Sequence, residues 1–240
     1  MKKFLSILAL LVWVFASVIA GQMIVGWPMK WILGDALGLP VWGAVYTALA
    51  YSASLALIVL VPMHLFKKWK VSRKDLGFNS LPTWTDIGLA PVGFVAATLL
   101  AAVFVWIFSF FPWFDAEQVQ NVGFSPLMTS PFDRVIAFFT LAIVAPIAEE
   151  TIFRGWLYGL VRKKTATVMG NIWSMIVSSL LVSFLFGLVH FQWNVSVNVF
   201  AMSLVLCAMR EITGTIYSGI LMHMIKNGVA FWLLYIMGIN

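Results

Sequence analysis

The sequence contains little charge, a single cysteine and only three histidines in 240 residues. Charged residues make up 10% of the chain and hydrophobic residues 62%, with a mean hydropathy of +0.98. Soluble domains are about 25% charged and about 45–50% apolar, so this composition excludes an ordinary soluble domain. The lone Cys207 excludes an internal disulfide and any metal site built from several cysteines.

No basic block stands clear of the apolar segments, although the net charge is +6. The positive balance therefore indicates membrane topology rather than nucleic-acid binding, and the expected partner is a lipid bilayer. The sequence also lacks an internal repeat and a low-complexity linker. We therefore expect a single membrane domain over residues 1–240.

Long apolar runs predict an all-α fold, a polytopic transmembrane helix bundle of about seven to eight spans. Strands are not expected, because an open sheet cannot satisfy its backbone polar groups in lipid. The apolar tail, residues 228–239, is short for a span of ~20 residues; it is half-buried, tilted or continuous with the seventh helix. The predicted spans are residues 4–25, 41–66, 87–111, 135–161, 171–190, 195–209 and 212–227.

The amino-terminal run allows two interpretations. Lys2 and Lys3 precede it, as they would in a signal peptide cleaved after Ala20, but the run exceeds the usual length of about 7–15 apolar residues. We favour a retained helix, followed by a short loop over residues 26–40 with tryptophans at the membrane interface. Most lysines and arginines fall on one side of this layout, which predicts a multi-pass protein of the cell membrane with a cytoplasmic amino terminus.

Three charged residues lie inside the predicted fourth span. Each charge at bilayer depth costs about 2.5–3.5 kcal/mol on insertion scales, so Glu149, Glu150 and Arg154 need partners and a function. Residues four apart share a helix face, and we therefore expect Glu150 to pair with Arg154 in a structural role. Glu149 points about 100° away around the helix and is the expected working group.

Two histidines lie within apolar spans. Taken alone, His190 could be a helix-end residue bonded to a neighbour, and His223 could be polar glue between helices. His223 and Asn227 are four apart, however, so they can present an imidazole and an amide to one cavity.

Three ordered motifs together resemble those of a known family. They are Glu149-Glu150-x-x-x-Arg154, Phe186-x-x-x-His190 and His223-x-x-x-Asn227. This arrangement resembles the CAAX-protease and bacteriocin-processing (CPBP or Abi) family of intramembrane proteases, which includes the Ras-converting-enzyme proteases. The motif-bearing core covers about residues 134–228, and the first two spans carry no family residue that can be identified.

The resemblance implies a glutamate-type endopeptidase. Glu149 would activate a water, His190 would help to orient or deprotonate it, and His223 with Asn227 would form the oxyanion site. Phe186 would border the pocket for substrate and water. No cofactor is then required. Zinc held by carboxylates and imidazoles is the competing reading, although the sequence has no His-Glu-x-x-His motif and adjacent glutamates point in different directions.

Two further classes of function stay open beside a peptidase acting on peptide or membrane-protein substrates. A non-catalytic peptide-binding or bacteriocin self-immunity protein could use the same cavity, and a transporter could use the buried charges as a proton relay. The sequence defines neither the natural substrate nor the oligomeric state. It also leaves a conflict between the depths of two site residues in the membrane. At ~1.5 Å per residue, Glu149 lies ~18 Å from the basic residues 162–164, whereas His190 lies ~28 Å from residue 171 on the same side.

Overall fold

A computed structural model describes residues 2–116 and 130–238, and the described residues form helices joined by turns and loops, with no strand among them. The predicted all-α fold is confirmed. The helices are α1 (Lys2–Leu33), α2 (Pro40–Leu55), α3 (Trp84–Phe108), α4 (Pro131–Phe139), α5 (Ala145–Glu150), α6 (Tyr158–Leu188), α7 (Trp193–Thr213) and α8 (Tyr217–Phe231). Wider π-helical turns extend α2 over Ala56–Leu65 and α8 over Trp232–Met237, and they join α4 to α5 over Thr140–Val144 and α5 to α6 over Thr151–Leu157.

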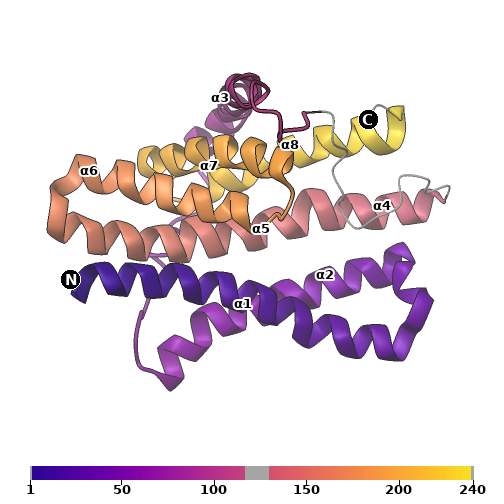
Figure 1. The fold of residues 1–240 in the computed structure, drawn as a ribbon, viewed down its shortest axis with the longest axis horizontal. Coiled ribbons are helices and arrows are strands. Elements are labelled where there is room, and N and C mark those ends of the chain that lie inside the picture. The colour runs from indigo at the N-terminus through magenta and orange to yellow at the C-terminus, as the bar shows by residue number, and fades with distance from the viewer. Residues whose placement is uncertain (1, 117–129, 239–240) are drawn as a thin grey trace.

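Six helical stretches in the described ranges are long and apolar enough to cross a membrane, close to the seven to eight expected. The longest, Pro131–Leu188, folds back on itself within α6 (Figure 1), so its two arms correspond to two of the predicted spans. The apolar tail continues the last helix, which runs from Tyr217 to Met237. The protein is thus a multi-pass membrane protein.

The reversal within α6 occurs at Gly170, which has φ 74° and ψ −178°. This backbone region is accessible essentially only to glycine. The helix thus extends past the end of the fourth span predicted near residue 161 and continues through Arg162, Lys163 and Lys164 before it turns. Two of these cations bind side chains of other helices: Arg162 pairs with Glu211 of α7 at 2.9 Å, and Lys164 donates to Ser6 Oγ of α1 at 2.9 Å.

The predicted loop over residues 26–40 is also mostly helical. Helix α1 passes through Gly26 and Pro28 and ends at Leu33, leaving only a short 3-10 turn, Gly34–Gly38, before α2. A side chain at Gly26 would meet the Tyr46 ring at 3.4 Å, so packing of α1 on α2 keeps the helix continuous there. Trp31 lies on the outer surface and is 88% exposed.

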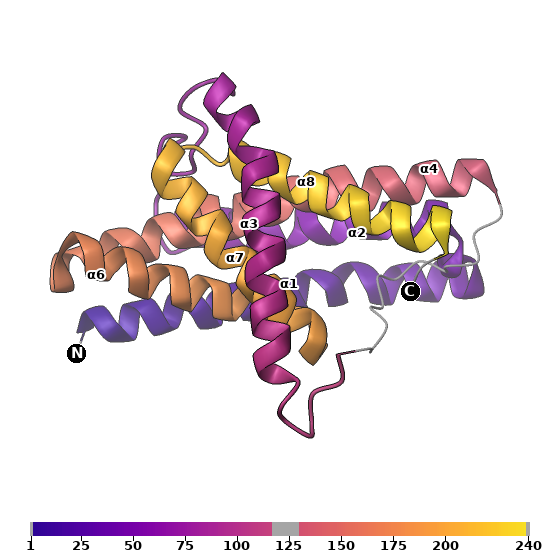
Figure 2. The ribbon, with the colours of Figure 1, turned by 90° about the horizontal axis from the view of Figure 1, so that it is seen from above.

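The helices form layers (Figure 1). Helices α1 and α2 lie side by side beneath the α4–α5–α6 stretch, with α7, α8 and α3 beyond it. Figure 2 shows α3 running crosswise over α7 and α8, against which it packs. Leu10 and Val14 of α1 are fully buried together with Trp156 and Leu206. The first helix is therefore part of the core.

The basic residues gather at one end of the bundle. The Lys164–Ser6 bond places the α6 turn beside the start of α1. Arg210, in the last turn of α7, donates to the Asp75 carbonyl at 3.1 Å and so holds the loop after α2 at the same end. The Ser72 N–H and hydroxyl groups donate to the Asp75 carboxylate and lower its pKa.

Candidate active site

Glu149 and His190 lie at matching distances from the turn of α6. Glu149 is 170 − 149 = 21 residues before Gly170, and His190 is 190 − 170 = 20 residues after it. Because both arms are helical, nearly equal numbers of residues bring the two side chains to nearly the same depth. The position of the turn therefore removes the conflict of depth that the sequence left.

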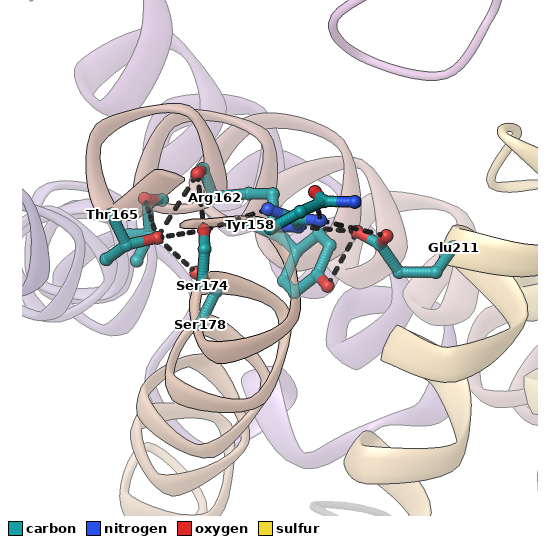
Figure 3. A network of polar contacts seen from close by, with 8 residues as sticks. Tyr158, Arg162, Thr165, Ser174, Ser178 and Glu211 are labelled. Atoms are coloured by element: carbon teal, nitrogen blue, oxygen red, sulfur yellow. Dashed lines mark hydrogen bonds and ion pairs between the residues drawn. The ribbon is translucent and has the colours of Figure 1, made fainter. Parts of the chain in front are cut away.

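A polar network fixes the two arms of α6 to each other and to α7 (Figure 3). Arg162 on the first arm donates to Ser174 Oγ on the second at 2.8 Å and to Glu211 on α7 at 2.9 Å. Thr165 Oγ1 contacts Ser174 Oγ at 2.6 Å and Ser178 Oγ at 3.0 Å. Such a network prevents one arm from sliding along the other, and so it keeps Glu149 level with His190.

One cavity of about 430 Å³ is lined by all four residues predicted to be catalytic. The α5 helix supplies Glu149, the end of α6 supplies His190, and α8 supplies His223 and Asn227. Residues of α1 and α2 form the opposite wall, and Phe186 also borders the cavity. The structure thus gathers groups that are 78 residues apart in the chain (227 − 149).

Glu150 pairs with two groups rather than one. Its Oε1 atom accepts a hydrogen bond from Arg154 Nη1 at 3.1 Å, as the spacing predicts, and also lies 3.0 Å from His223 Nδ1. Both Glu150 and Arg154 are essentially inaccessible to solvent. A carboxylate only accepts, so His223 carries a hydrogen on Nδ1. Its Nε2 atom can then donate only when the imidazole is protonated.

Glu149 approaches the other nitrogen of the same imidazole. Its Oε2 atom lies 3.8 Å from His223 Nε2, so the adjacent glutamates contact opposite edges of one ring. The remaining Oε1 atom accepts a hydrogen bond from the Tyr51 hydroxyl, which comes from α2. Sequence analysis did not identify Tyr51, because a lone tyrosine in an apolar helix carries no motif.

His190 is oriented by its own helix. Its Nδ1 atom lies 2.7 Å from the Phe186 carbonyl oxygen, which can only accept, so Nδ1 carries the hydrogen and Nε2 is left as an acceptor. The Phe186 ring is fully buried and contacts both imidazoles edge-on, with centroid distances of 5.0 Å to His190 and 6.2 Å to His223. Arg154 covers the same ring at 4.4 Å. Phe186 is thus the apolar spacer between the charged pair and the cavity.

Asn227 joins α8 to the segment before α5. Its Nδ2 atom donates to the Leu141 carbonyl at 2.9 Å, which uses one of its two hydrogens and leaves the other, with Oδ1, for a ligand. Lys226 also lines the cavity and lies within electrostatic range of Glu149. Its position between two motif residues gave no separate signal in the sequence.

The carboxylates and imidazoles do not form a metal cage. Among residues 2–116 and 130–238, no three His, Cys, Asp or Glu side chains are grouped so that they could hold an ion. His223 directs Nδ1 to Glu150 and its other nitrogen toward Glu149, an arrangement that suits hydrogen bonding.

Comparison with known protein families gives a match to the carboxy-terminal part of the chain. Residues 131–229 match the family model described as "Type II CAAX prenyl endopeptidase Rce1-like". This match confirms the resemblance seen in the three motifs, and it includes every predicted site residue. Neither the curated proteins nor the solved structures yielded a match to the chain.

Proposed function

We propose, because residues 131–229 match the Rce1-like family of CAAX-type endopeptidases, that Glu149 is the general base of an intramembrane endopeptidase that needs no metal. The observation that carries the proposal is the convergence of Glu149, His190, His223 and Asn227 on one cavity. A reacting carbonyl in that cavity would have a base on one side and hydrogen-bond donors on the other.

The first step is attack by water. Glu149 accepts a proton from the water as the water oxygen bonds to the scissile carbonyl carbon, and His190 Nε2 accepts a hydrogen bond from the second O–H of the water, which fixes the direction of attack. The carbonyl π electrons move to oxygen, which becomes an oxyanion. His190 suits this task because its Nδ1–H is already directed to the Phe186 carbonyl.

The second step is stabilisation of that oxyanion and departure of the amine. Protonated His223 donates from Nε2, and Asn227 donates its second Nδ2 hydrogen; each such donor typically contributes about 10²–10³ in rate. Glu150 stabilises the imidazolium from the opposite edge of the ring. The oxyanion electrons re-form the carbonyl and the carbon–nitrogen bond breaks as the proton held by Glu149 moves to the leaving nitrogen, which yields a carboxylic acid and an amine and returns Glu149 to its carboxylate form.

Substrates are peptides or membrane-protein segments that reach the cavity from the bilayer. Helices α1 and α2 form one of its walls, and these helices are apolar enough to span the membrane. We further propose that the basic end of the bundle faces the cytoplasm, which places the amino terminus inside the cell.

Incubation of the purified protein in detergent with a reporter peptide library, analysed by mass spectrometry, tests this function. The proposal predicts hydrolysed peptides from the parent protein and none from Glu149→Ala. Peptides bound intact by both proteins would instead support a non-catalytic binding or immunity protein. Equal hydrolysis by both would remove Glu149 from the mechanism.

A further inference from the structure

The amino-terminal helices contribute a polar side chain directly to Glu149. Tyr51 lies on α2, outside the family-matched residues 131–229, yet its hydroxyl donates to Glu149 Oε1. No other hydrogen bond to Glu149 is made by the side chains within residues 2–116 and 130–238. The contact therefore joins two parts of the chain that are 98 residues apart.

Local sequence explains why Tyr51 faces the cavity. Thr47, Tyr51 and Ser54 follow the i, i+4, i+7 spacing of one helix face, and all three line the cavity wall. On α1, Gly21 has no side chain where the backbone and hydroxyl of Ser54 approach it closely. This close packing of α1 on α2 fixes the rotation of α2 and with it the direction of Tyr51.

We propose that Tyr51 is a positioning residue that holds Glu149 by Oε1 and leaves Oε2 as the oxygen that receives the proton from water. The inference rests on the proposed function, since it assigns a role in the same site. A carboxylate that accepts one fixed hydrogen bond loses rotational freedom. The α1–α2 pair is then required for a complete active site.

The other charged or titratable groups around Glu149 come from three elements. His190 lies at the end of α6, His223 and Lys226 lie on α8, and Glu150 is the next residue of α5. Each of these groups is also present in a Tyr51→Phe variant. A change in turnover, or in the carboxylate vibration of Glu149, in that variant therefore reports the lost phenol hydroxyl rather than a lost charge.

The test compares Tyr51→Phe with Tyr46→Phe. Tyr46 lines the same cavity from the same helix without a bond to Glu149. We expect Tyr51→Phe to lower kcat by roughly 10-fold or more with little change in KM, since it removes a hydrogen bond to the charged group that activates water. Tyr46→Phe should show a much smaller loss of kcat. Tyr51→Leu, which also lacks the hydroxyl, replaces Tyr51→Phe if the latter does not accumulate.

The outcomes separate this inference from the function on which it rests. An unchanged kcat in Tyr51→Phe, with Glu149→Gln inactive, would overturn the role of Tyr51 alone. If no variant or parent cleaves peptides, the infrared carboxylate band of Glu149, assigned by its loss in Glu149→Gln, still decides. A shifted carboxylate stretching band in Tyr51→Phe supports the inference, and an identical band contradicts it.

Discussion

The Oε1 atom of Glu150 lies 3.0 Å from Nδ1 of His223, so Glu150 supports a cavity residue as well as Arg154. We expect Glu150→Gln to slow turnover by roughly 10–100-fold, because the His223 imidazolium loses a charged hydrogen-bond partner. Steady-state kinetics provide the measurement, and an unchanged kcat would restrict Glu150 to its pairing with Arg154.

Arg154 is predicted to be essential for stability. Arg154→Ala leaves Glu150 without its guanidinium partner in a site closed to solvent, and removal of one member of a buried pair typically costs about 3–5 kcal/mol. Thermal unfolding in detergent should show a much lower midpoint and reduced accumulation. Arg73→Ala, on the exposed loop after α2, is the matched control and should melt like the parent. If Arg154→Ala unfolds at the same temperature as the parent, the Glu150–Arg154 pair does not stabilise the fold.

The turn of α6 is predicted to depend on glycine. A methyl group at Gly170 would meet nothing within 4 Å, so any effect of Gly170→Ala arises from the backbone conformation at φ 74°. Strain of this kind costs about 1–3 kcal/mol. Gly88→Ala, also in open space but at an ordinary helical position, is the control and should be neutral or slightly stabilising. Equal unfolding midpoints for the two variants would contradict this account of the turn.

Sequence periodicity predicted the contacts made within one helix better than those made between helices. The i, i+4 spacing correctly joined Glu150 to Arg154, because neighbours on one helix face depend on local geometry alone. The second partner of Glu150, His223, is 73 residues away, and no local pattern encodes that distance. Tyr51 was missed for the same reason.

The helices extend beyond the predicted span ends where charge was taken as the marker of an end. Arg162 and Lys164 seemed to end the fourth span, but both remain in the helix because Glu211 and Ser6 meet them there. The helix reverses at Gly170 instead, and the positive φ of this residue is a property of the folded backbone. In α1, similarly, packing against α2 overrides the Gly26 and Pro28 that suggested a loop.

Asn227 is predicted to act mainly on the chemical step. Asn227→Ala should lower kcat by roughly 10²-fold through loss of an oxyanion donor, with little change in KM. The Leu141 contact is lost as well, so the unfolding midpoint should fall modestly, by the equivalent of about 1 kcal/mol. A large rise in KM with kcat unchanged would assign Asn227 to substrate binding instead.

The claim that Glu149 activates water without a metal ion is tested most directly by measuring turnover of the parent protein and of Glu149→Gln after metal has been removed. After treatment with 1,10-phenanthroline, the parent should retain its activity, because Glu149 itself activates water. Glu149→Gln, which is nearly isosteric but cannot accept the proton, should fold normally and show no turnover. Loss of parent activity on chelation, its return with added zinc and about one zinc ion per chain would contradict the account.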